Sequence, residues 1–204
     1  MGRLGEVCYP CRRRSVWCGV ATCVVGVVAC IFLVALVVYL MFRPNLLHAT
    51  AVDADLSTFS LALKAWTLTY NLSVGMDLSR RRARLVLHYH AVAADAYYQD
   101  QRFAHARLPD FSQPASTNVT RLQPSFHGHH QLQGGVAAAA FRREDTEGTF
   151  SINVMVVAKT EIQALALRLP GPHMKLDCPL RLQRWNASSS QPLVFHPTAC
   201  YVSY

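Results

Sequence analysis

A single long apolar run near the start of the chain differs from everything that follows it. Residues 17–42, WCGVATCVVGVVACIFLVALVVYLMF, contain no charged side chain. As an α-helix this run would measure about 39 Å, whereas the hydrocarbon core of a bilayer is about 30 Å thick. A cleavable signal peptide is the alternative, but its apolar region is shorter and ends in small residues, and this run ends in Met41-Phe42. The pattern predicts an uncleaved transmembrane helix.

Beyond this run, apolar and polar residues alternate. Every second position from Trp66 to Leu78 is apolar, and most residues between them are polar. Shorter stretches repeat the alternation at 59–63, 85–89, 150–156, 165–169, 176–182 and 200–204. This period is typical of a strand with one buried and one hydrated face. Short strands of this kind, separated by Pro, Gly and Asn, predict an all-β fold, an antiparallel β-sandwich.

Two places interrupt the alternation. Pro170-Gly171-Pro172 is expected to end the strand at 165–169. Residues 136–140, VAAAA, favour a helix by composition, but they follow Gly134-Gly135 and have no capping residue. A loop or a short strand is therefore an equal alternative for this segment.

The charges around the apolar run give it a direction. Residues 1–16 carry four arginines and one glutamate, whereas Arg43 is the only Lys or Arg between the run and Lys64. The flank with more positive charge normally stays in the cytoplasm. We therefore expect a basic cytoplasmic tail at 1–16, a transmembrane helix at 17–42 and an extracellular or lumenal domain at 43–204.

The chain has a net charge of +8. A basic surface outside the cell suggests contact with acidic polysaccharide or lipid headgroups. Nucleic acid is not expected as a partner, because the domain lies on the other side of the membrane. One candidate anion patch consists of Arg80, Arg81, Arg82 and Arg84, and a solvated turn is the alternative.

Two groups of cysteines are expected to differ in chemistry. Cys178 and Cys200 are the only cysteines beyond the apolar run, and each shares a predicted strand face with apolar neighbours. In an oxidising compartment such a pair forms a disulfide, worth about 3 kcal/mol, and two free buried thiols are the alternative. Cys8, Cys11 and Cys18 stand at the cytoplasmic edge of the run and are candidates for palmitoylation.

Small residues recur along one side of the apolar run, at Gly19, Cys23, Gly26 and Cys30. Such a stripe lets two helices approach closely and would allow a homo-oligomer through this helix. The alternative is that the stripe faces lipid.

Three sequons for N-linked glycosylation begin at Asn71, Asn118 and Asn186. Asn118 is the best placed, because it lies in a polar stretch. Asn186 begins a serine-rich run, and Asn71 falls on the hydrated face of a predicted strand. All three become usable if the domain is lumenal or extracellular.

Motifs for catalysis are not found. The sequence has no G-x-S-x-G, no H-E-x-x-H and no phosphate-binding glycine loop. The histidines at 127, 129 and 130 and the pair His88 and His90 are interpreted as surface residues rather than metal ligands. We expect no enzymatic activity, no metal and no cofactor.

Five segments carry a resemblance to a known family. They are Tyr70-Asn71-Leu72-Ser73, residues 96–103 (AYYQDQRF), Leu108-Pro109-Asp110-Phe111, Asn118-Val119-Thr120 and Lys175-Leu176-Asp177-Cys178. In this order they are similar to the plant harpin-induced-like (NHL) family, related to the non-race-specific disease-resistance proteins. The chain departs from the family pattern where Arg80-Arg81-Arg82 replaces Asn-Pro-Asn and His88-Tyr89-His90 replaces Tyr-Tyr-Asp.

The resemblance implies a late embryogenesis abundant (LEA) group 2 domain, a β-sandwich of fibronectin III or immunoglobulin-like character. It implies a single-pass plasma-membrane protein of the hypersensitive, or pathogen, response that acts as a non-catalytic binding or scaffolding module. Its partner would be a defence-signalling protein or a cell-wall polysaccharide. The alternatives are a desiccation- or stress-protective protein and a linker between plasma membrane and cell wall.

Overall fold

The computed structural model describes residues 12–41, 47–62, 65–80, 86–164, 167–184 and 195–204. The chain forms two compact units, Met1–Arg43 and Pro44–Tyr204. The first contains helix α1, Arg12–Met41, and the side chains described in it are those of residues 23–37. These are exposed and largely apolar. Among the described residues, no helix is both long enough and apolar enough to cross a membrane.

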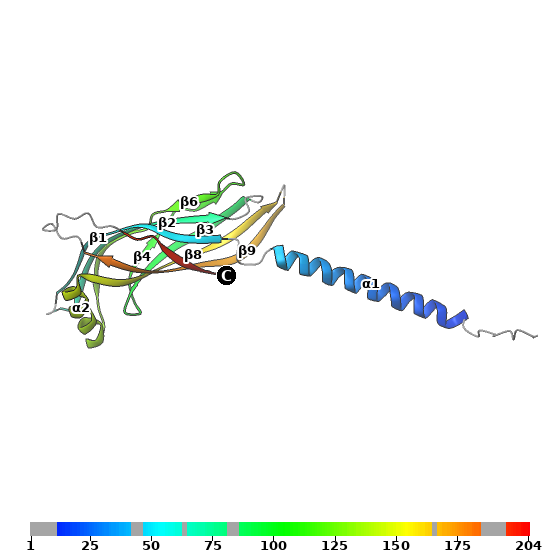
Figure 1. Cartoon of the computed structure of the whole chain (residues 1–204), viewed down its shortest axis with the longest axis horizontal. Helices are drawn as coiled ribbons and strands as arrows, with labels where there is room; N and C mark the ends of the chain where they lie inside the picture. Colours follow the sequence, from blue (N-terminus) through cyan, green and yellow to red (C-terminus); the bar gives the residue numbers. More distant parts are fainter. Residues whose placement is uncertain (1–11, 42–46, 63–64, 81–85, 165–166, 185–194) are drawn as a thin grey trace, which may run out of the picture. The chain divides into compact units, whose positions relative to one another are not determined.

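The second unit is an antiparallel β domain with one helix (Figure 1). Its elements are β1 (Leu47–Ala62), β2 (Thr67–Arg80), β3 (Val86–Tyr98), β4 (Gln101–Arg107), β5 (Phe111–Gln113), β6 (Val119–Leu122), β7 (Ser125–Gln131), α2 (Gly135–Glu147), β8 (Thr149–Ala164), β9 (Leu167–Gln183) and β10 (Thr198–Ser203). The strands pair in the order β4-β3-β8-β9-β10-β1-β2-β6, while β5 pairs with β3 and β7 with β2. The predicted antiparallel β class is confirmed.

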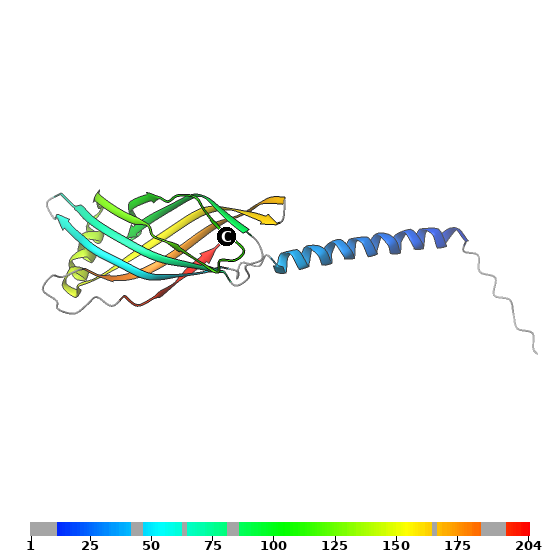
Figure 2. The ribbon, with the colours of Figure 1, turned by 90° about the horizontal axis from the view of Figure 1, so that it is seen from above.

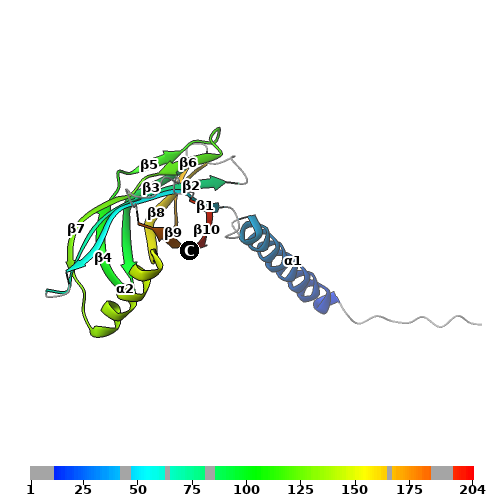
Figure 3. The ribbon, with the colours of Figure 1, turned by 60° about the vertical axis from the view of Figure 1, so that its left-hand side comes forward.

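Strand β10 joins the two halves of the sheet. Its first residues pair with β1, with Cys200 opposite Ala49, and its last residues pair with β9, with Ser203 opposite Lys175. The fold therefore differs from the predicted sandwich in one respect. Its two halves are not separate sheets but parts of one continuous hydrogen-bonded sheet. Figure 3 shows how this sheet curves.

The core lies between the two halves and is rich in aromatic rings. Phe59 of β1 contacts Tyr98 of β3, Phe103 of β4, Phe141 of α2 and Phe150 of β8, with ring centroids 4.8 to 6.0 Å apart. Most of these contacts are edge-to-face, which is a favourable geometry for aromatic pairs. Since the rings come from both halves and from α2, the cluster ties these elements together.

The segment with an ambiguous sequence becomes helix α2, which continues well beyond 136–140 to Glu147. Ala137, Ala138 and Phe141 are buried. The helix ends at Gly148, which has a φ of 71° and donates its backbone N–H to the carbonyl of Glu144. A left-handed residue is the common way to end a helix, and glycine adopts it without strain.

The predicted end of a strand at Pro170-Gly171-Pro172 is wrong, because β9 runs through these residues. The register shifts between Lys159 and Glu161 of β8, so the three residues form an irregularity in the pairing. Gly171 lies so close to Thr160 that a Cβ atom at this position would collide with the Thr160 hydroxyl. A bulge of this kind accommodates proline because the ladder is already interrupted.

Candidate functional site

The structure joins Cys178 and Cys200, the pair that the sequence predicts, in a disulfide. Their Cα atoms are 4.4 Å apart, and Tyr201 pairs with Asp177, so the two cysteines lie directly opposite each other on β9 and β10. Cys178 is fully buried, and its Sγ lies 3.5 Å from the Sδ of Met76. The bridge therefore holds β10 at the point where it passes from one half of the sheet to the other.

The prediction of an anion patch that includes Arg80 is wrong for this residue. Arg80 is only 6% exposed, at the end of β2, and its Nη2 donates to the carbonyl of Pro114. Burial disfavours the charged form and lowers the pKa of Arg80, while the nearby Tyr89 raises it. Arg81, Arg82 and Arg84 lie outside the described residues.

The predicted modification sites are placed in part. Asn71 is exposed on β2, and Asn118 is exposed just before β6, where its carbonyl accepts the backbone N–H of Arg80. Asn186 lies outside the described residues. Glycosylation at the three positions stays a prediction.

The predicted features of the N-terminal unit also stay predictions. Cys8 and Cys11 lie outside the described residues, and Cys18 is in α1 but has no described side chain. Of the small-residue stripe, Cys23 and Cys30 are exposed free thiols, and open space surrounds Gly26.

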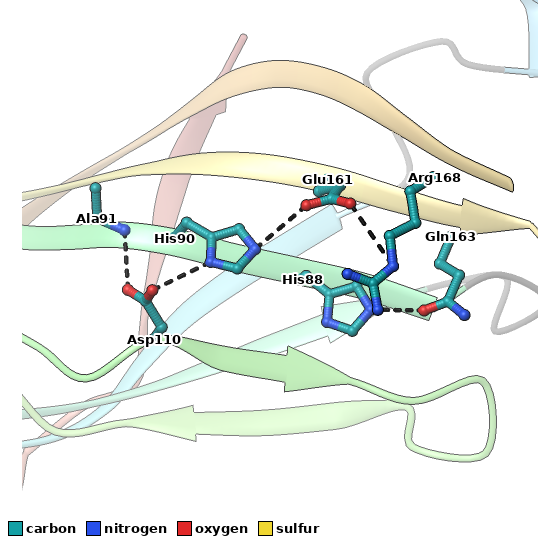
Figure 4. A network of polar contacts seen from close by, with 7 residues as sticks. All are labelled: His88, His90, Ala91, Asp110, Glu161, Gln163 and Arg168. Carbon is teal, nitrogen blue, oxygen red and sulfur yellow. Dashed lines mark hydrogen bonds and ion pairs between the residues drawn. The ribbon is translucent and has the colours of Figure 1, made fainter.

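His88 and His90 do lie on one hydrated strand face, within a polar cluster shown in Figure 4. Their rings stack with centroids 6.3 Å apart. His90 Nδ1 lies 3.1 Å from Oδ2 of Asp110, and its Nε2 lies 3.5 Å from Oε2 of Glu161. An imidazole can donate to both carboxylates at once only when it is protonated. The His90 ring thus bridges two carboxylates from different strands at the surface.

The remaining contacts of the polar cluster follow the same strands. His88 Nε2 lies 2.9 Å from Oε1 of Gln163, and Nε of Arg168 lies 4.0 Å from Oε1 of Glu161. The Glu161 side chain is 30% exposed and that of Arg168 65%. Exposed pairs of this kind contribute little stability because solvent screens them.

The β domain contains a cleft of about 1070 Å³. It lies between β1 and β9, and β8, the β3–β4 turn and the residues just before β10 complete its walls. Three exposed carboxylates, those of Asp53, Asp55 and Asp100, line it together with Arg181 and His196. The lining therefore has more acidic than basic groups.

One polar atom in the wall of the cleft lacks a partner. The buried Oδ1 of Asn153 on β8 has no hydrogen bond among the described residues. A buried acceptor without a donor costs about 1–3 kcal/mol. No sequence signal identifies this site, because its walls come from segments far apart in the chain.

These features describe a disulfide-bonded antiparallel β domain that follows a largely apolar helix and holds an acidic cleft. No family model matches the sequence. NDR1/HIN1-like protein 10 of Arabidopsis thaliana is 25% identical over 181 residues, which cover 87% of this chain and 79% of that protein. NDR1/HIN1-like protein 2 of the same plant is 25% identical over 167 residues, which cover 81% of this chain and 69% of that protein. NDR1/HIN1-like protein 3, also from this plant, is 24% identical over 171 residues, which cover 83% of this chain and 73% of that protein.

The chain is therefore a distant homologue of the NDR1/HIN1-like proteins of Arabidopsis, and the family resemblance seen in the sequence is confirmed. A crystal structure of a protein from Archaeoglobus fulgidus can be superposed over 66% of this chain and 97% of the chain in that structure. Its sequence identity is 7% and the TM-score is 0.31, so it supports no conclusion about function.

Proposed function

We propose that this chain is a single-pass plasma-membrane protein of the plant defence response, with its β domain outside the cell as a non-catalytic binding module. Residues 17–42 anchor it, residues 1–16 lie in the cytoplasm, and the β domain is of the LEA group 2 type. The distant homology supports this proposal, because it covers 87% of the chain, more than residues 44–204 alone account for. The homologous proteins belong to a family not known as enzymes.

Two features of the chain favour an outside location for the β domain. The apolar run has its arginines on the N-terminal side, which favours a cytoplasmic N-terminus. The Cys178–Cys200 disulfide suits an oxidising compartment, since the cytosol keeps thiols reduced.

The acidic cleft is the observation that carries the binding role. Its three carboxylates, of Asp53, Asp55 and Asp100, repel an acidic polysaccharide and attract a partner with positive charge. A basic segment of a protein fits this chemistry better than a pectin-like polymer does.

Proximity labelling tests the proposal. The full chain, carrying a labelling enzyme at its C-terminus, is expressed in intact plant cells with and without pathogen challenge. We expect a small set of proteins that is labelled more strongly after challenge and is lost when Asp53→Lys and Asp55→Lys are combined. Glu147→Lys is the matched control, because Glu147 is exposed on α2 and does not line the cleft. An identical set with both variants would contradict the role of the cleft, and labelling of cytosolic proteins alone would contradict the proposed topology.

A further inference from the structure

Strand β10 parts from β9 at the disulfide. Its last residues, 201–203, pair with β9, whereas its first residues, 198–200, pair with β1. Figure 2 shows β10 in red beside β9 in orange. From Cys178 to Gln183, β9 pairs with β8 on one side, and no described residue pairs with its backbone on the other side. Among the described residues, this part of β9 is therefore an open strand edge.

The acidic cleft follows this open edge. Every residue from Pro179 to Gln183 lines it, so the cleft meets both the inward and the outward side chains of β9. A recess over one face of a strand would be lined by every second residue, because side chains alternate between the faces. Residues 53–56 of β1, and Phe195 and His196 just before β10, form further walls. The cleft therefore lies where a further strand beside β9 would lie.

The direction of the backbone groups along this edge follows from two neighbouring residues. Cys178 and Cys200 lie opposite each other with Cα atoms 4.4 Å apart, the spacing of an antiparallel pair that exchanges no hydrogen bonds. The N–H and C=O of Cys178 therefore point away from β10, towards β8. Pro179 agrees with this direction, because a proline in a paired strand has its nitrogen on the unpaired side. Since successive residues alternate, the N–H and C=O of Arg181 and Gln183 also face the cleft.

The two faces of the edge differ in chemistry. Leu180 and Leu182 are buried, whereas the carboxylates of Asp53, Asp55 and Asp100 in the same cleft are exposed. An extended segment beside β9 turns one row of side chains inward, over the two leucines, and the other row outward. The outward row meets the carboxylates. A fitting segment therefore alternates basic side chains with apolar side chains of small or moderate size.

We propose that the basic partner segment binds as an added strand along Pro179–Gln183, antiparallel to β9 as β8 and β10 are. This rests on the proposed function, which assigns a basic protein segment to the cleft, and it states how that segment is held. The segment has about five residues and is about 17 Å long. Its backbone pairs with Arg181 and Gln183 and supplies affinity, while its alternating side chains supply specificity.

The test uses the full chain in detergent micelles and a fluorescent peptide of alternating lysine and valine, blocked at both ends. Opposite residues of an antiparallel pair share a face, and those that face each other with N–H and C=O exchange hydrogen bonds. The residues opposite Arg181 and Gln183 are therefore lysines, and their amides bond to β9. One further peptide is N-methylated on the lysine amides and another on the valine amides, so both lose donors and keep their charge. Fluorescence anisotropy measures each Kd.

We expect methylation of the lysine amides to weaken binding by about tenfold or more, and methylation of the valine amides to weaken it far less. Asp53→Lys combined with Asp55→Lys should abolish binding. Arg181→Gln should tighten it, because this change removes a like charge opposite a lysine. A gain of affinity cannot come from misfolding, and mobility on a non-reducing gel verifies the disulfide in each variant.

The outcomes separate the mode of binding from the role of the cleft. Equal affinities of the two methylated peptides, with binding still lost in the double variant, would overturn strand addition and leave the acidic cleft as a binding site. Absence of binding by the unmethylated peptide, or binding that the double variant leaves unchanged, would overturn both. A stable dimer that excludes the peptide would assign the open edge to a second copy of the chain and overturn the proposal.

Discussion

The two ends of the β domain use their side chains in opposite ways. At the end that holds α2, the aromatic rings around Phe59 are buried, and the carboxylate of Glu144 is buried with them at 5% exposure. It accepts the hydroxyl of Tyr98 at 2.9 Å and the backbone N–H of Ser151 at 3.4 Å. At the hairpin end, where β8 ends and β9 begins, two leucines and the polar cluster around His90 face solvent. The first end supplies stability, and the second leaves its side chains available for contacts outside the domain.

The largest expected difference between the two ends comes from removing an apolar side chain. Phe150→Ala deletes a ring that is fully buried and lies 4.8 Å from the ring of Phe59, so it should lower the free energy of unfolding by about 3–5 kcal/mol. Leu167→Ala, at the hairpin end where this side chain is 59% exposed, should change it by less than about 0.5 kcal/mol. Urea unfolding of the full chain in detergent, followed by circular dichroism, measures both. Similar losses in the two variants would contradict the division between the ends.

The disulfide should have the next largest effect, because it links two residues that are 22 apart in the sequence. It also fixes β10, the strand that joins the two halves of the sheet. Cys200→Ser should lower the free energy of unfolding by about 3 kcal/mol. The same urea experiment measures the loss. A reducing agent should destabilise the unaltered chain by a similar amount and leave the Cys200→Ser variant unchanged. If the reductant has no effect on either protein, the bridge is not formed in solution.

A single hydroxyl should matter at the buried end. Tyr98→Phe removes the donor to Glu144 and leaves a buried carboxylate with one weaker contact, at a cost of about 1–3 kcal/mol. Burial is also the main reason that the pKa of Tyr98 is raised, followed by the hydrogen bond to Glu144. Tyr201→Phe is the matched control, because Tyr201 is 73% exposed. Equal thermal unfolding midpoints for the two variants would show that the buried hydrogen bond adds nothing.

Arginine at each end offers the finest comparison. Arg184 lies beside α2, where Nη1 donates to Oδ1 of Asp145 at 2.8 Å and to the carbonyl of Phe59 at 3.4 Å. Arg184→Ala should cost about 1 kcal/mol, since it removes bonds from a charged donor that lies over the Phe150 ring. Arg168→Ala should cost less than about 0.5 kcal/mol, because its ion pair is long and exposed. A loss at Arg168 as large as that at Arg184 would show that the polar cluster stabilises the fold.

The sequence predicts much of the fold, because most of the long strands bury one face. Alternation from Trp66 to Leu78 identifies β2, although Trp66 itself stands in a turn with a φ of 52°. The sequence does not reveal β7, SFHGHHQ, since its histidines hide any alternation and only its pairing with β2 makes it a strand. The sequence also predicts, wrongly, that a strand ends at Pro170-Gly171-Pro172. The bulge that lets β9 continue depends on the partner strand and not on local preference.

The candidate sites were harder to predict than the strands. The disulfide follows from two inward-facing cysteines, and the shared face of His88 and His90 follows from their spacing. The burial of Arg80 could not be predicted, because Pro114, which accepts its hydrogen bond, is distant in the sequence. The acidic cleft could not be predicted for the same reason, since Asp100 is distant in the sequence from Asp53 and Asp55 and lines the cleft with them only in the folded domain.

The central claim is that the β domain lies outside the cell on a membrane anchor, and surface labelling tests it most directly. The lysines of the chain, Lys64, Lys159 and Lys175, all lie beyond residue 43, and the side chains of Lys159 and Lys175 are exposed. A membrane-impermeant amine reagent added to intact protoplasts should therefore label the full chain, and the triple Lys→Arg variant should not be labelled. Labelling that appears only after the cells are permeabilised would contradict the account.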